Sequence, residues 1–164
     1  MNIDKKLIIE QVKEYGKDII FSETIKQEKN YIQHGNVSVY EHSFNVACMA
    51  LYISRKYHIK TDEKTLVRGA LLHDYFLYDW HIPDKSHRLH GFTHAQTALS
   101  NAMRDFKLNK IEMDIILKHM FPLNISFPRY RESIIVCLAD KHCAIMEMKS
   151  DIKFKIDDKN LELF

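Results

Sequence analysis

Glycine and proline are scarce in this chain, and that scarcity constrains the fold more than any other feature of the sequence. Only four glycines and three prolines occur in 164 residues. Between them, apolar residues recur at spacings of three and four, the period of an amphipathic helix. An all-α fold follows. The pattern predicts helices over residues 3–20, 40–57, 62–79, 92–106, 109–120 and 130–149.

Local signals mark the ends of several predicted helices. Asp62 and Asn109 precede apolar periodic runs, and their short side chains suit the N-cap position. Pro122 and Pro128 bracket a loop in which a helix cannot easily continue.

The length of the chain predicts one domain over residues 1–164. Its parts would be an N-terminal helix over 3–20, a core over about 40–149 and a tail over 150–164. The stretch IKFKI in the tail alternates weakly and suits a short strand or an extended arm.

Charge and hydropathy exclude several classes of protein. The net charge is +2, with acids and bases interspersed and no long basic block, so no nucleic acid polymer is expected as a partner. No apolar run approaches the roughly 18 to 20 residues that span a bilayer, and the first residues lack the apolar stretch of a signal peptide. Cys48, Cys137 and Cys143 are odd in number and lie in apolar segments, which suits free thiols in a reducing cytoplasm.

Ten histidines are many for a chain of this size, and some of them form a pattern with aspartates. Six side chains fall on separate predicted helices, apart from one adjacent pair: His42, His73, Asp74, His94, His119 and Asp140. A single histidine on a helix is more often a surface or hydrogen-bonded core residue. Jointly, imidazole and carboxylate ligands on several helices favour a site for Fe, Mn, Zn, Co or Ni over a thiolate zinc site.

The adjacent pair His73 and Asp74 interrupts an apolar run, LLHDYFLYDW. Neighbours on a helix point about 100° apart, so both can reach one ion only from the same side of a close cleft, or they can serve two adjacent ions. An unpaired buried carboxylate costs several kcal/mol, which a cation or a salt bridge offsets. The pair is therefore unusual as core filling.

The order His42, His73-Asp74, Asp140 resembles the pattern H...HD...D of the HD-domain metal-dependent phosphohydrolase superfamily. The resemblance covers roughly residues 40–149 and includes the contexts EHSFNVACMALYIS, GALLHDYF and IIVCLADKHCAI. His94 and His119, in HGFTHAQTALSNA and IILKHMFP, resemble the middle histidines of the two-metal subset H...HD...H...H...D.

The resemblance implies a bundle of five to seven helices around one or two divalent metal ions. His42, His73, Asp74 and Asp140 would hold the first ion. Asp74, bridging, would hold the second together with His94 and His119. The chain departs from the family at three points. Tyr75 and Phe76 follow the pair where many members carry Ile-Gly. The GYP triplet of cyclic-di-GMP phosphodiesterases is missing, which disfavours hydrolysis of cyclic-di-GMP. Nor does a clear Glu-Asp pair follow the HD helix, as it does in (p)ppGpp hydrolases.

The resemblance also implies hydrolysis of a small phosphorylated molecule such as a nucleotide, with Asp74 orienting the attacking water. Lys141, Arg68 and Arg88 are candidates for binding the substrate phosphate, although a lone cation is more often a solvated surface residue. Asp79 and His90 are candidates for the proton donor, and His90 also for substrate binding, with a local loop role as the alternative.

Three further histidines, His34, His58 and His142, are expected to be structural or solvent-facing. The aromatic residues after the His-Asp pair suit either the core or the wall of a substrate pocket. The sequence does not distinguish a monomer from a homodimer.

Two other functional classes fit the same residues. Diiron oxygenases use the same helical scaffold and the same six ligands, so O2 chemistry on a small organic substrate is one alternative. A non-catalytic, metal-binding regulatory module is the other.

Overall fold

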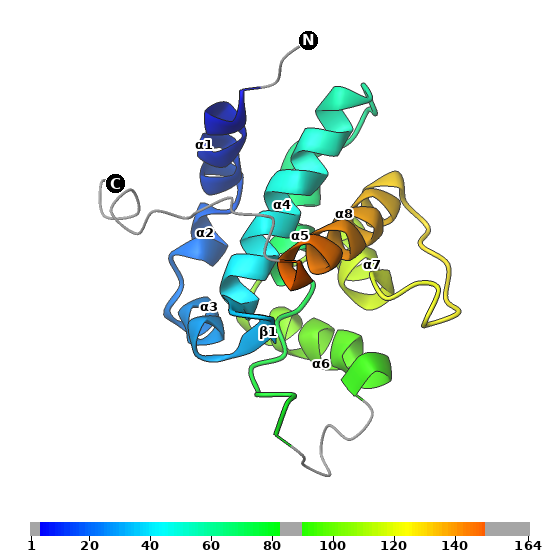
Figure 1. Ribbon diagram of the computed structural model, residues 1–164. Coiled ribbons are helices and arrows are strands. Elements are labelled where there is room, and N and C mark those ends of the chain that lie inside the picture. Colours follow the sequence, from blue (N-terminus) through cyan, green and yellow to red (C-terminus); the bar gives the residue numbers. More distant parts are fainter. Residues whose placement is uncertain (1–3, 83–89, 150–164) are drawn as a thin grey trace.

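The computed structural model describes residues 4–82 and 90–149, and these residues are predominantly helical (Figure 1). Eight α-helices occur within them, of which six exceed four residues. The six longer helices are α1 (Lys5–Tyr15), α4 (Val39–Lys56), α5 (Glu63–Leu72), α6 (His90–Asp105), α7 (Lys110–Lys118) and α8 (Arg131–Met148). The all-α prediction is confirmed. The tail over 150–164, with its suggested strand, lies outside the described residues.

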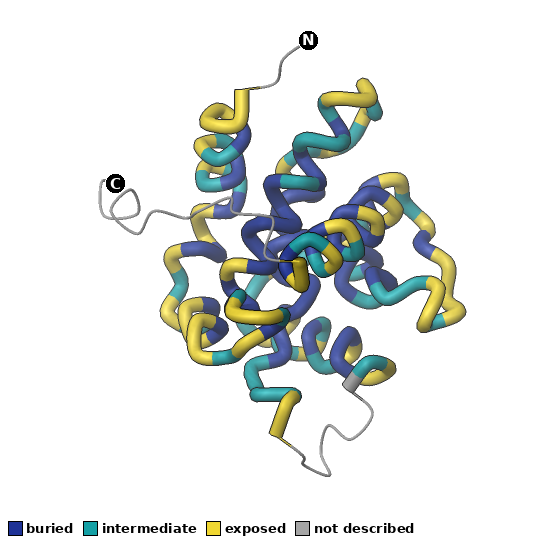
Figure 2. The backbone as a smooth tube through the Cα atoms, viewed as in Figure 1, coloured by how far each residue is buried: buried dark blue, intermediate teal, exposed yellow. Residues whose placement is uncertain are grey.

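Helix α4 lies at the centre of the fold. It packs against α5 and α8, and α7 in turn packs against α5, α8 and α6. In Figure 1, α1 lies on one side of α4 and α7 and α8 lie on the other. The buried stretches drawn in dark blue in Figure 2 run along α4 and the helix faces turned toward it. The core is thus assembled around the helix that carries His42.

Capping side chains explain where the long helices begin. Asp62 accepts a hydrogen bond from the Thr65 amide at 2.9 Å, as predicted for the start of α5. Asn109 accepts from the Glu112 amide at 2.9 Å, and Glu112 returns a hydrogen bond by accepting from the Asn109 amide at 2.8 Å. This reciprocal capping box satisfies two amides of the first turn of α7, so both predicted N-caps are confirmed.

The predicted helix over 3–20 is broken. Gly16 ends α1 and precedes the short helix α2 (Lys17–Ile20). A Cβ atom at Gly16 would lie 2.2 Å from Leu71 Cδ1, so a larger residue here would displace the Leu71 side chain of α5. The break lets the N-terminal helices bend around the core.

The predicted helix over 62–79 ends early, at Leu72, with His73 as its C-cap. The chain then turns: the Tyr75 amide donates to the Leu72 carbonyl at 3.3 Å and Leu77 adopts a left-handed φ of 55°. Buried Tyr75 anchors the new direction, because its hydroxyl donates to Asp105 at 2.8 Å on α6. His73 and Asp74 therefore lie at a helix end, where adjacent side chains are freer to diverge than within a helix.

Gly69 brings α5 and α7 into direct contact. A Cβ atom at this position would lie 2.4 Å from Ile115 Cδ1 and 3.1 Å from Ile115 Cβ. Because α5 leads into His73 and α7 leads into His119, this close packing sets the separation of two candidate ligands.

The segment between α2 and α4 contains structure that the sequence pattern did not predict. It forms the short helix α3 (Glu23–Lys26), the 3-10 helix η1 (Gln27–Asn30) and an antiparallel hairpin of β1 (Ile32–His34) and β2 (Val37–Ser38). Gly35 makes the turn with a φ of 58°, a conformation that favours glycine. The hairpin contacts α4 and α8.

All three cysteines are free and buried, as expected from their number and setting. No helix among the described residues is long and apolar enough to cross a membrane.

Candidate metal centre

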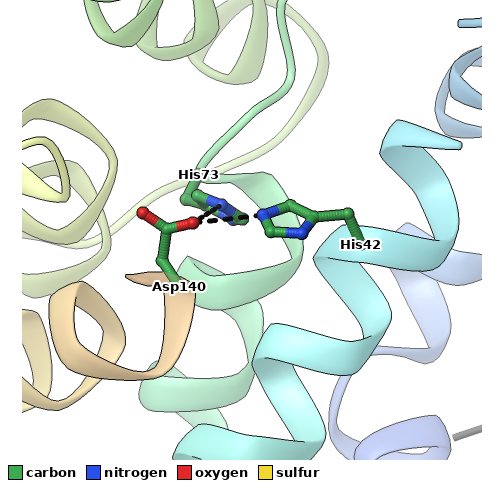
Figure 3. Close-up of side chains that lie close together, drawn as sticks. All are labelled: His42, His73 and Asp140. Carbon is green, nitrogen blue, oxygen red and sulfur yellow. Dashed lines mark hydrogen bonds and ion pairs between the residues drawn. The ribbon is translucent and has the colours of Figure 1, made fainter. Parts of the chain in front are cut away.

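Three side chains from distant parts of the chain meet beside α4. His42 comes from α4, His73 from the end of α5 and Asp140 from α8 (Figure 3). One potential ligand atom from each lies within 4.8 Å of the others, and all three residues are buried. Asp140 Oδ1 lies 3.1 Å from His42 Nε2 and 3.7 Å from His73 Nε2. We call these three residues the first trio.

A second trio lies next to the first and consists of Asp74, His94 and His119. His94 comes from α6, and His119 is the C-cap of α7. The Nε2 atoms of the two histidines lie 2.9 Å apart, and each is 3.3 Å from Asp74 Oδ1. All six residues singled out in the sequence are thereby brought into two adjacent groups.

Asp74 joins the two trios through its two carboxylate oxygens. Oδ1 faces His94 and His119, whereas Oδ2 lies 3.3 Å from His73 Nε2 and 3.8 Å from His42 Nε2. A carboxylate with one oxygen turned to each of two ligand groups has the arrangement needed to bridge two cations.

Hydrogen bonds at Nδ1 orient the rings of His73 and His119, so that Nε2 faces the cluster. His73 Nδ1 lies 2.7 Å from the Ala70 carbonyl, and His119 Nδ1 lies 2.8 Å from the Ile116 carbonyl. Because a carbonyl oxygen only accepts, Nδ1 carries a proton in both rings, and Nε2 is the nitrogen that can bind a cation once it is deprotonated. Such an outer hydrogen bond is typical of metal-binding histidines.

The Nδ1 atom of His42 faces a carboxylate, that of Glu147, instead of a backbone carbonyl. This Nδ1 lies 2.7 Å from Glu147 Oε2, and the other oxygen of Glu147 accepts from Asn45 Nδ2 at 3.0 Å. Both Glu147 and Asn45 are buried. The sequence analysis missed Glu147, although it follows Asp140 by seven residues and therefore lies on the same face of α8.

Opposite charges shift the pKa values of the cluster. Burial alone lowers the pKa of His42, but hydrogen bonds to Asp140 and Glu147 outweigh it and raise that pKa to about 9. Burial raises the pKa of the Asp74 carboxyl, yet the charge of His73 and the nearby imidazoles of His119 and His94 hold that pKa well below its ordinary value. The carboxylates thus favour positive charge within the cluster, whether as protons or as a metal cation.

The donor set fits one or two divalent cations. Among the described residues, His73 Nε2 and Asp74 Oδ1 are buried atoms without a hydrogen-bond partner, and each belongs to a different trio. Leaving such atoms unpaired is costly, and coordination to a metal would satisfy both. Four imidazoles and two carboxylates, with no thiolate, suit Fe, Mn, Co, Ni or Zn.

Arg68, predicted to bind substrate phosphate, is held in structural contacts. Its guanidinium is ion-paired with Asp18, with Glu112 at 2.7 Å, and donates to the Lys107 carbonyl at 3.2 Å. It lines a groove of about 440 Å³ whose walls include none of the six cluster residues. These contacts tie α5 to α2 and α7 and give no support to a substrate role.

The remaining residues predicted to bind substrate or transfer a proton are Lys141, Asp79, Arg88 and His90. Lys141 Nζ donates to the carbonyls of His119 and Cys137 at 2.9 and 3.4 Å, so it braces the end of α7. Asp79 accepts from the His81 amide at 2.9 Å. Arg88 lies outside the described residues, and His90 begins α6 without a described side chain.

Aromatic rings from the segment after the His-Asp pair adjoin the second trio. Phe76 is buried, and its ring meets that of His94 edge-on at 5.9 Å between centroids. Tyr78 lies against Phe76 at 4.9 Å, and burial together with the Asp74 charge raises the pKa of Tyr78 to about 12. Tyr75, by contrast, is a core residue.

Polar residues from the η1 and hairpin segment also reach the cluster. Gln33 Nε2 donates to Asp74 Oδ2 at 2.6 Å, and the ring of His34 meets that of His42 edge-on at 5.2 Å. Buried Glu28 interacts electrostatically with Asp74 and His73. His34, expected to be structural or solvent-facing, therefore lies at the site. His58 and His142 are exposed, also as expected. The turn signal Gly35-Asn36 was the only sequence feature that could have located this hairpin.

These features define an all-α domain with a paired histidine and aspartate cluster at its centre. Residues 39–145 match the family model described as the HD domain. The chain therefore belongs to the HD domain family, which indicates a metal-dependent hydrolase superfamily. A search of the curated proteins and a search of the solved structures each found no match.

Proposed function

We propose that this protein is a divalent-metal-dependent phosphohydrolase that cleaves a phosphoester of a small molecule, such as a nucleotide. Membership of the HD domain family supports the reaction class. The observation that carries the proposal is the position of Asp74, which turns one oxygen to each of two buried ligand groups. Two-metal hydrolases use this kind of arrangement to displace a phosphate ester in line.

On this proposal, six residues bind the two ions and other groups hold the ligand histidines in place. His42, His73, Asp74 and Asp140 hold the first ion, and Asp74, His94 and His119 hold the second. When bound, two such ions lower the pKa of water toward neutrality and polarise the phosphoryl group. Glu147 fixes His42, and the carbonyls of Ala70 and Ile116 fix His73 and His119. The rings then need no reorientation during the reaction, which favours catalysis.

The aromatic pair beside His94 supports a substrate with a ring. Phe76 and Tyr78 provide apolar surface close to the second trio, and base rings stack readily on aromatic side chains. Tyr78 is partly exposed, so it is the member of the pair that a ligand can reach.

The proposal is tested by metal analysis followed by a substrate screen. Purified protein is reconstituted with Mn²⁺ and assayed without oxygen for phosphate release from nucleotides, cyclic dinucleotides and sugar phosphates. Turnover with Mn²⁺ alone supports hydrolysis. Oxygen uptake that requires iron, without phosphate release, would establish the oxygenase alternative instead. Bound metal with neither activity would leave the regulatory module as the better description.

A further inference from the structure

Gln33 reaches the metal centre from outside the residues that match the HD domain. It lies in β1 and is 6% exposed, and its Nε2 donates to Asp74 Oδ2 at 2.6 Å. That oxygen is the one that faces His73 and His42. The amide therefore contacts the carboxylate shared by both trios, on the side of the first trio.

A β-bulge turns Gln33 toward the cluster. Ile32 pairs with Ser38 and His34 pairs with Val37, so β1 advances two residues while β2 advances one. Gln33 is the extra residue in this irregular register. Bulges bend a strand and redirect a side chain, and they are frequent next to active sites.

The side chain of Gln33 is poorly explained as a purely structural element. Within the described part of the chain, its Oε1 is buried and accepts no hydrogen bond. An unsatisfied buried acceptor costs about 1–3 kcal/mol, which offsets much of what the Nε2 hydrogen bond contributes. An apolar side chain of similar size would fill the same volume without that cost.

We infer that Gln33 is a positioning residue that holds Asp74 with one oxygen toward each trio, so that two cations can bind together. The inference rests on the proposed metal-dependent function. Without the amide, the carboxylate is freer to rotate about its Cβ–Cγ bond, and neither oxygen is held to its own trio. Removing an outer hydrogen bond of this kind typically weakens metal binding 10–100-fold.

The inference is tested with Gln33→Met, which preserves the volume of the side chain and removes the amide. Gln27→Met is the matched control, because Gln27 is an exposed glutamine in η1, just before β1. Mn²⁺ binding is measured by titration, and the metal pair is followed by electron paramagnetic resonance, since bridged Mn²⁺ ions are exchange-coupled and separate ions are not. Thermal unfolding of the metal-free proteins reports on the fold.

In Gln33→Met, we expect Mn²⁺ binding to weaken 10–100-fold and the exchange-coupled signal to be lost. The metal-free variant should unfold at a temperature close to that of the wild type. Gln27→Met should match the wild type in all three measurements. If Gln33→Met does not fold, Gln33→Ala is measured in the same way. Unaltered Mn²⁺ affinity and coupling in the folded variant would overturn the inference. A wild-type protein that binds no divalent metal would overturn the proposed function itself, and this inference with it.

Discussion

Glu147 Oε2 lies 2.7 Å from His42 Nδ1, which connects the end of α8 to the first histidine of the cluster. The same imidazole meets Asp140 through Nε2 at 3.1 Å, so one ring is held between two carboxylates two turns apart on a single helix. The orientation of His42 is therefore determined by α8 as much as by its own helix.

Replacing Glu147 should weaken metal binding without direct loss of a ligand. Glu147→Ala removes the acceptor at His42 Nδ1 and is expected to lower divalent metal affinity 10–100-fold. Glu147→Gln keeps a neutral acceptor and should lose less. Isothermal titration with Mn²⁺ measures both, and Glu10→Gln, an exposed site on α1, is the control. Equal affinities for wild type and Glu147→Ala would show that His42 needs no such support.

Asp74 is the residue whose loss should affect both metal positions together. Asp74→Ala is expected to bring metal content below one ion per chain and to abolish phosphate release, because Asp74 belongs to the second trio and turns its other oxygen to the first. Its helical circular dichroism should remain. Elemental analysis after dialysis gives the metal content. By contrast, His94→Ala should spare the first trio, so retention of about one ion by that variant is the matching expectation.

Metal binding should tighten as the pH rises toward 9. The hydrogen bonds of His42 to Asp140 and Glu147 outweigh its burial and raise its pKa to about 9, so at neutral pH a proton occupies a ring that a cation needs. Each displaced proton allows up to a tenfold gain in apparent affinity per pH unit below that pKa. Mn²⁺ titrations at pH 6.5, 7.5 and 8.5 in buffers of different ionisation enthalpy measure the trend and the proton release. A pH-independent affinity would contradict it.

The sequence predicted most of the long helices, because helix periodicity depends on local spacing. The six clustered residues were singled out instead by their residue types on separate predicted helices and by the resemblance to the HD pattern. The sequence pattern could not locate the end of α5: apolar residues continue past Leu72, and the turn there depends on Tyr75 contacting Asp105 and on Asn101 Nδ2 donating to the Tyr75 carbonyl. Such contacts between segments about 30 residues apart leave no periodic signal.

The same limit explains which contacts of Arg68 and Gln33 could not be predicted. Arg68 is an isolated cation in the sequence, but its partners Asp18 and Glu112 lie 50 and 44 residues away along the chain. Gln33 lies 41 residues before Asp74, in a hairpin too short for an alternation pattern to emerge. The helical period predicts which face of a helix is buried. It does not predict which charged residue of a neighbouring segment contacts that face.

Arg68→Ala should reduce stability rather than remove a substrate contact. The side chain of Glu112 is 3% exposed, so the substitution leaves a buried carboxylate without its ion pair. Breaking such a pair typically costs about 3–5 kcal/mol. Urea unfolding measures the loss, with the exposed Arg104→Ala as control. A large increase in KM at unchanged stability would restore the substrate role predicted from the sequence.

Glu28 should make stability depend on pH. It is fully buried, and within the described residues neither carboxylate oxygen has a hydrogen-bond partner. Burial, reinforced by the charge of Asp74, raises its pKa well above the ordinary value of 4.5. Between that value and the raised pKa, the folded protein binds more protons than the unfolded chain, so stability falls as pH rises.

Glu28→Gln removes this titration. Relative to the wild type, the variant should gain stability as the pH increases from 5 through the raised pKa, by up to about 1.4 kcal/mol for each pH unit in that window. Urea unfolding at pH 5 to 8 in the presence of EDTA keeps metal binding out of the comparison, and Glu10→Gln serves as the exposed control. Parallel pH profiles for wild type and Glu28→Gln would mean that Glu28 is already ionised in the folded protein. In that case its carboxylate would add to the negative charge of the metal centre, and Glu28→Gln should weaken Mn²⁺ binding instead.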